Sequence, residues 1–222
     1  DRPPVTSHTA RLDRDQNAGS PEGALAELRG GRIRLESAGL ACEWDAAAGL
    51  AWRQLVHKPK GVPLLYESGN SPLFIVLGKD FYCDSRDCVI EDVRIGGGDV
   101  RQSAELSLRH RESGLTFQLG ASLAAGEDLR LWLRVRNGGR ETRRLQTVFP
   151  IVGRVRTDGD RRGLRYFYPW RSGIVGDVDA YLMNEYGNLA WVQLMCAFDP
   201  ASGAAFALYP RDSAGEVKGL IL

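Results

Sequence analysis

The chain has 222 residues, which is enough for one large all-β domain or two small ones with a sizeable core. Hydrophobic residues make up 43% and charged residues 26%, as is ordinary for a globular protein. The net charge of +1 gives no long-range attraction to nucleic acid or to an anionic membrane. No apolar run approaches the roughly 20 residues of a membrane span. We therefore expect neither nucleic acid nor membrane as a partner.

The first 28 residues mix Pro and Gly with polar residues and show no sustained period. This composition predicts a flexible tail or linker over residues 1–28. One β-sandwich domain is expected over residues 29–222, and a truncation of this domain at its C-terminal end is left open. Because the chain begins with Asp1, we expect a mature form or an excised fragment. The sequence does not set the location, with a secreted or periplasmic one slightly favoured.

Strand patterns follow one another from residue 32 onward. Short strands are expected over residues 32–37, 40–44 and 50–56. Apolar and polar residues then alternate over residues 104–110 and again over residues 115–121. Because Glu112-Ser113-Gly114 lies between the two runs, they are expected to form a hairpin.

The clearest single strand is expected over residues 128–136. Its leucines and Val135 point one way, while Trp132 and three arginines point the other. Asn137-Gly138-Gly139 follows and suits a tight reversal, so the next strand, from about Arg143 to Phe149, is expected to run back beside it.

The C-terminal part has the same character. Strands are expected over residues 189–198 and 204–209, joined by a turn at residues 199–203, and a last one from about Val217. About a dozen strands at a spacing of roughly 8–12 residues, with no convincing helix, predict an all-β fold, specifically a large antiparallel β-sandwich.

Few residues are suited to catalysis or metal binding. Of the three histidines only His110 lies in a predicted strand, where a packing role is more common than a catalytic one. The four cysteines match no zinc or redox spacing, and we expect no metal and no other cofactor. Cys83 and Cys88 are close enough in sequence for a local disulfide in an exported protein, while Cys42 and Cys196 read as buried thiols.

The stretch "RYFYPWRSG" contains four aromatic rings in five positions. In an extended chain Tyr166, Tyr168 and Trp170 share one face, where a pyranose ring could stack. The same rings could equally plug the end of a sandwich. Asp177 and Asp179 lie in a long loop close by and are carboxylates of the kind that glycoside hydrolysis uses, although a solvated loop is the simpler interpretation.

Three segments carry a resemblance to a known family. They are "LWLRVRNGGRETRRLQTVFPIVG", "YFYPWRSG" and "WVQLMCAFDPASGAAFALYPRD". Their order resembles that of the galactose-mutarotase-like β-supersandwich at the N-terminus of several bacterial glycoside hydrolases. The resemblance covers residues 32–222, and its motifs are short.

The resemblance implies a non-catalytic domain that packs against a C-terminal catalytic (β/α)8 barrel of the same parent chain and contributes to carbohydrate binding. No catalytic residue is assigned, because such carboxylates lie on the barrel. The residues expected to contact carbohydrate or the catalytic domain are Tyr166, Tyr168, Trp170, Arg171, Asp177, Asp179, Arg211 and Asp212.

Two alternatives stay open at this point. A stand-alone aldose epimerase or mutarotase would need an acid and a base across the sugar ring oxygen, with His110 as the strand candidate. A carbohydrate-binding module without a catalytic partner would instead use Trp170 as its anchor.

Overall fold

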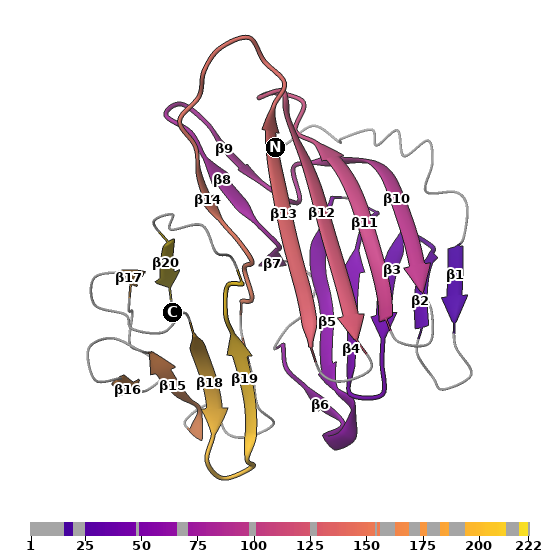
Figure 1. Cartoon of the computed structure of the whole chain (residues 1–222), viewed down its shortest axis with the longest axis vertical. Coiled ribbons are helices and arrows are strands. Elements are labelled where there is room, and N and C mark those ends of the chain that lie inside the picture. The colour runs from indigo at the N-terminus through magenta and orange to yellow at the C-terminus, as the bar shows by residue number, and fades with distance from the viewer. Residues whose placement is uncertain are drawn as a thin grey trace, which may run out of the picture. The chain divides into compact units, whose positions relative to one another are not determined.

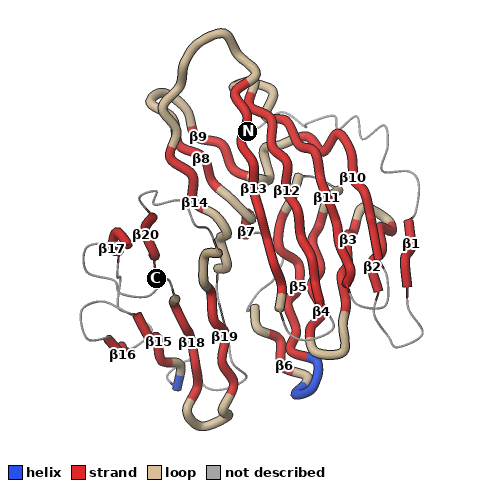
Figure 2. Tube along the Cα trace, viewed as in Figure 1, coloured by secondary structure: helices blue, strands red, loops and turns tan. Residues whose placement is uncertain are grey.

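The computed structural model describes the chain in segments. They are residues 16–19, 25–47, 49–65, 71–97, 101–124, 128–153, 155, 163–168, 174–176, 183–186, 194–211 and 218–221. Strands and loops make up nearly all of the described trace (Figure 2). The all-β antiparallel fold expected from the sequence is confirmed. No helix in these segments is long and apolar enough to cross a membrane.

The chain divides into two compact units, Asp1–Gly61 with Glu67–Gly153 and Val62–Tyr66 with Arg154–Leu222. Each is described by itself. Unit 1 contains the strands β1 (Gln16–Gly19), β2 (Leu25–Arg29), β3 (Arg32–Glu36), β4 (Leu40–Asp45), β5 (Ala51–His57), β7 (Ser71–Pro72), β8 (Ile75–Leu77), β9 (Tyr82–Asp84), β10 (Val89–Gly97), β11 (Arg101–Arg109), β12 (Leu115–Ala124), β13 (Leu129–Asn137) and β14 (Gln146–Val148), and the 3-10 helix η1 (Lys58–Lys60).

The first sheet of unit 1 runs in the order β1-β2-β3-β4-β5, with β7 paired to β5. Its pairs are antiparallel, with Leu28 opposite Ile33 and Leu35 opposite Cys42. Alternate residues are buried along β2 and β3, so one face of this sheet is apolar. The strands expected over residues 32–37, 40–44 and 50–56 are confirmed as β3, β4 and β5.

The second sheet runs in the order β10-β11-β12-β13. The predicted β11–β12 hairpin is confirmed, and its register places Leu106 opposite Leu119 and Leu108 opposite Phe117. Its turn closes at Gly114, whose φ of 69° is the left-handed conformation that glycine adopts without strain. The inward residues of both strands are buried, as the alternation predicted.

These two sheets stack face to face to make a sandwich, in which β10, β11 and β12 contact β2 and β3 (Figure 1). The core between and beside them holds two aromatic pairs. The rings of Trp44 and Trp52 have centroids 5.3 Å apart, and those of Phe74 and Phe117 are 4.8 Å apart. Trp52 also donates its indole N–H to the carbonyl of Ile151 at 2.8 Å, which satisfies a buried polar group.

Strand β14 corrects one prediction. It pairs with β8 in a small sheet ordered β14-β8-β9, with Thr147 opposite Val76. The prediction that this strand pairs with β13 is therefore wrong, and the strand is shorter than the expected residues 143–149. Asn137 makes a local turn, in which its carboxamide oxygen accepts from Gly139 N–H, and the chain then continues to another sheet.

Unit 2 contains β6 (Val62–Pro63), β15 (Arg165–Tyr168), β16 (Ile174–Gly176), β17 (Met183–Tyr186), β18 (Met195–Asp199), β19 (Ala204–Leu208) and β20 (Lys218–Ile221). Four of them form a sheet ordered β16-β15-β18-β19, and β17 pairs with β20. The β18–β19 turn closes as expected, with Gly203 at a φ of 64° and its N–H bonded to the carbonyl of Asp199.

Two observations differ from the expected domain boundaries. Strand β1 and all but the last residue of β2 lie within the range 1–28 predicted as a tail, and residues 29–222, predicted as one sandwich, belong to two compact units. Ala26 and Leu28 of β2 point into the core. Leu25, next to Ala26, is apolar as well, so these five residues do not alternate strictly, and the sequence pattern did not indicate a strand.

Candidate functional site

The structure describes only some of the site residues expected from the sequence. Trp170, Arg171, Asp177, Asp179 and Asp212 lie outside the described residues. Tyr166 and Tyr168 belong to β15, where they lie opposite Gly176 and Ile174 of β16. Arg211 is exposed three residues after β19.

Tyr166 lies on the more buried face of the unit 2 sheet. It is half-buried, and its neighbour in the sheet is Ala197, which is buried and faces Phe206 in turn. The opposite face holds Val175, which is 60% exposed. This placement favours packing for Tyr166 over sugar stacking, while the assignment of the other rings stays a prediction.

His110 is a turn residue. Its Nδ1 lies 2.8 Å from the hydroxyl of Ser113 and also accepts from the backbone N–H of Ser113 at 3.3 Å. The Ser113 hydroxyl accepts from the N–H of Leu115, so its own hydrogen is available for Nδ1. Both side chains are buried, at 6% and 7% exposure. An imidazole held in this way closes the β11–β12 hairpin and is poorly placed to protonate a sugar.

The turn between β9 and β10 is anchored by Asp84, whose side chain is buried. Its carboxylate accepts from the Arg86 guanidinium at 2.5 and 3.0 Å, from the Arg86 backbone N–H at 2.8 Å and from the Tyr82 hydroxyl at 3.1 Å. Burial by itself would raise the pKa of Asp84, but these hydrogen bonds and the Arg86 charge outweigh it and hold the pKa below its ordinary value.

The same turn contains Cys83 and Cys88. Both are buried free thiols, and their sulfur atoms lie 3.9 Å apart. The hydrogen bond with Cys83 and the burial of the site raise the pKa of Cys88. Among the described residues, no group of three or more His, Cys, Asp or Glu side chains is placed to hold a metal ion.

The outward face of the first sheet carries a ladder of ion pairs. Glu43 pairs with Arg53 at 2.8 Å, Glu36 with Arg34 at 2.5 Å and Glu36 with Lys58 at 2.6 Å. A hollow of about 440 Å³ on this face is lined by Glu27, Arg29, Gly30, Arg32, Arg34 and Glu43. Because acidic and basic groups alternate and pair here, this face reads as a solvated surface.

The outward face of the second sheet has a different character, because it presents an aromatic ring. Trp132 on β13 is opposite Gly120 on β12, and its side chain is 43% exposed. A Cβ atom on Gly120 would lie 2.0 Å from the indole Nε1 and Cε2 atoms. The ring therefore lies over the glycine, where any other residue would collide with it, and the side turned away from the sheet faces solvent.

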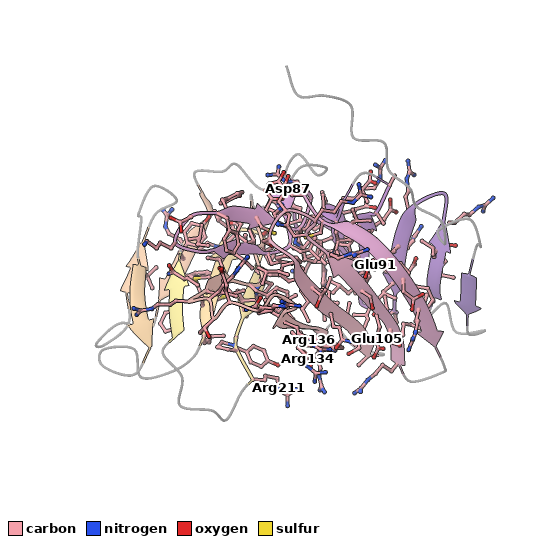
Figure 3. All side chains as sticks on the ribbon, turned by 90° about the horizontal axis from the view of Figure 1, so that it is seen from above. Asp87, Glu91, Glu105, Arg134, Arg136 and Arg211 are labelled. Carbon is pink, nitrogen blue, oxygen red and sulfur yellow. The ribbon has the colours of Figure 1, made fainter. Side chains whose placement is uncertain are left out.

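Polar side chains surround this ring. Glu105 on β11 is opposite Gly120 and so is the next outward residue across the sheet. Arg134 follows Trp132 on the same face and donates to the Gln118 carboxamide oxygen at 3.2 Å. We call Gly120, Trp132, Glu105, Gln118 and Arg134 the Trp132 platform. Arg134 and Glu105 project from one side of unit 1, with Arg136, while Asp87 lies on the other side (Figure 3).

The Trp132 platform was not among the site residues expected from the sequence. The alternation along residues 128–136 already predicted from the sequence that Trp132 lies on the polar face of this strand. Its partner Gly120 is found only once the register between β12 and β13 is known. A large aromatic residue among charged residues on an outward strand face was the available signal.

Comparison with known proteins identifies no family for this chain. No protein-family model matches the chain, and no curated protein matches it. Among solved structures, the chain is similar to the GH36 alpha-galactosidase AgaB from Geobacillus stearothermophilus, at 11% sequence identity and a TM-score of 0.49. The match covers 83% of this chain and 32% of that chain, so this chain spans about a third of that enzyme's length. A likeness this weak does not bear on activity.

Proposed function

We propose that the chain is a non-catalytic carbohydrate-binding β-sandwich domain of a glycoside hydrolase, with a catalytic domain of the same parent chain as its partner. The observation that supports sugar binding most directly is the ring of Trp132, which lies over Gly120 and leaves its other side in solvent. The three sequence motifs that resemble glycoside hydrolase supersandwich domains support the link to such an enzyme.

The Trp132 platform has the chemistry that a sugar needs. The C–H groups on one side of a pyranose pack against an aromatic face, while the hydroxyl groups need acceptors and donors around the rim. Glu105 supplies an acceptor, and Arg134 supplies donors. All of them stand on paired strands, which hold side chains more precisely than loops do.

An open sheet face favours binding over bond cleavage. Glycoside hydrolysis needs two carboxylates that flank the bond, and closing a site around that bond removes water from it. A flat surface centred on one exposed ring can hold a sugar chain without enclosing it. This geometry supports a role in which the domain retains the polysaccharide and the catalytic domain cuts it.

The sugar-binding part can be tested by titrating the purified chain with a panel of plant and bacterial oligosaccharides in a calorimeter. We expect binding that Trp132→Ala abolishes. The control variant is Tyr82→Ala, which removes another exposed aromatic side chain, 51% exposed, from a different sheet. Equal affinity in the native protein and the Trp132→Ala variant would show that the platform is not the binding site.

The non-catalytic part has its own test. We expect no turnover when the 222-residue chain is incubated with aryl glycosides, and release of the aryl group above the rate of the buffer would contradict the proposal. The proposed catalytic domain can be sought in the parent gene. We expect it to encode, after Leu222, several hundred further residues in which strand and helix patterns alternate.

A further inference from the structure

Resting on the proposed sugar binding, we propose that the Trp132 platform selects acidic glycans, in which a uronate carboxylate is bound by arginines of β13 while the sugar ring stacks on Trp132. Arg130, Arg134 and Arg136 all point outward with Trp132 and are exposed. Residues two apart on a strand are roughly 6.6 Å apart along its axis, so Arg130 and Arg134 flank the ring on its two sides.

Many cations of unit 1 are paired with carboxylates, whereas Arg134 of β13 and a few others, such as Arg143, have neutral partners. Arg53, Arg86, Arg94 and Arg109 each form an ion pair with a carboxylate. Arg134 instead donates to the neutral Gln118 side chain. Arg130 and Arg136 have no carboxylate within ion-pair distance in the described part of the chain. The three positive charges along β13 are thus not neutralised by described neighbours.

A simpler role exists for arginines at this position. Strand β13 is the last of its sheet in the described residues, and charged side chains on such a strand discourage pairing with other chains. That role does not require a large exposed ring between two arginines, and an exposed tryptophan works against it. The combination of an aromatic plane with guanidinium groups on both sides matches a ligand that has both an apolar face and an anionic group.

The charges also set the orientation of the ligand. Glu105 lies across the sheet from Trp132, beyond Gly120, and would repel a carboxylate held above it. The uronate carboxylate is therefore directed along β13 toward Arg130 or Arg134, where a planar guanidinium can match both of its oxygens. The hydroxyl groups on the opposite edge of the sugar point toward Glu105, which accepts their hydrogen bonds.

The test compares two ligands that differ only in charge. The probes are tetrasaccharides of galacturonate and of mannuronate, each beside its carboxyl-reduced form, titrated into the full chain at low and at high salt. We expect the acid form of at least one pair to bind about 3- to 30-fold more tightly at low salt, as one or two exposed ion pairs would give. That ratio is expected to approach one in about 0.5 M NaCl, where exposed charges are screened.

Variants then assign the preference to β13. Arg130→Gln combined with Arg134→Gln should remove the preference for the acid form and leave binding of the carboxyl-reduced form in place. The matched control is Arg109→Gln, which removes one charge from the same outward face two strands away, where Glu91 already neutralises it. An equal loss in the control would overturn the inference, because only the overall charge of the domain would then matter.

The remaining outcomes separate this inference from the proposed function. Equal affinity for the acid and carboxyl-reduced forms overturns the acidic preference and leaves sugar binding standing. No binding of either form, across the whole panel, overturns the proposed function itself. Acid-form binding that survives Trp132→Ala overturns the stacking arrangement. A sulfated galactan oligosaccharide that binds more tightly than every uronate chain would overturn the assignment to a carboxylate.

Discussion

The contact between Trp132 and Gly120 predicts that Gly120→Ala lowers the free energy of unfolding of the native protein but raises that of the Trp132→Ala variant. Gly120→Ala would place a Cβ atom 2.0 Å from the indole ring, so the ring must move off the strand. In a Trp132→Ala background the same alanine meets no ring. There it should stabilise the protein, by about 0.5–1 kcal/mol, because alanine loses less backbone entropy than glycine on folding.

The size of the effect follows from the covered area. Trp132 is 43% exposed, so a little over half of a side chain of roughly 250 Å² rests on the sheet. Returning about 140 Å² to water at about 25 cal/mol per Å² costs at most about 3.5 kcal/mol. The ring will keep part of its contacts, and alanine offsets part of the loss. We therefore expect Gly120→Ala to destabilise the native protein by about 1–2.5 kcal/mol.

The assay is urea unfolding of the native chain, the two single variants and the double variant, followed by circular dichroism. The coupling free energy between the two sites should be about 1.5–3.5 kcal/mol. Gly120→Ala should also weaken sugar binding, although residue 120 itself touches no sugar. The reasoning is refuted if Gly120→Ala has the same sign and a similar size in both backgrounds, since the ring would then not lie over Gly120.

Three further predictions concern the β9–β10 turn and its neighbours. The pKa of Asp84 is lowered in the folded protein, so its ionised carboxylate stabilises the fold above about pH 5, and this stabilisation is lost as the pH falls through the folded pKa. Asp84→Asn should therefore lower the urea midpoint at pH 7 more than at pH 3. Gly49→Ala should lower the free energy of unfolding by about 2–4 kcal/mol, because Gly49 has a φ of +102° and an added Cβ would lie 2.1 Å from the Arg86 carbonyl oxygen. Gly61 has a φ of +64° and open space around it, so Gly61→Ala should cost only about 1–2 kcal/mol. Equal losses in thermal or urea unfolding would contradict this account. Refolding in a glutathione redox buffer should join Cys83 to Cys88, whose sulfurs lie 3.9 Å apart, with a mass loss of about 2 Da in the peptide that contains both. Cys42, which is buried and whose thiol is bonded to the carbonyl of Leu35, should stay a thiol; peptide mapping that finds Cys42 oxidised and this pair reduced would reverse the assignment.

The sequence predicted the parts of the fold that depend on local alternation. The β11–β12 hairpin was predicted with its turn, because period-two burial and a Glu-Ser-Gly turn are both local signals. The predicted partner of β14 was wrong, because Asn137-Gly138-Gly139 indicates a turn but not the strand with which the next segment pairs. Pairing between distant strands is set by the packing of the core, and no local pattern contains that information.

The candidate site shows the same division. The aromatic stretch around Tyr166 attracted attention because its rings are adjacent in the sequence, yet Tyr166 lies on the more buried face of its sheet. Trp132 stands alone in its segment, and its role depends on a glycine twelve residues earlier in the chain. Sequence patterns find clustered residues more readily than pairs that are brought together by register.

The two outward faces of unit 1 show why the second is the better candidate for function. Both belong to strands whose inward residues build the core, so folding constrains the inward positions and leaves the outward ones free to vary. On the first sheet, carboxylates such as Glu36 and Glu43 neutralise the cations beside them, which keeps the surface soluble. On the second sheet, an exposed ring is kept over a glycine, where strand stability alone would favour a residue with a side chain. The ring covers this glycine and still presents an open aromatic face to solvent between two arginines, and that open face is what the proposed sugar-binding role uses.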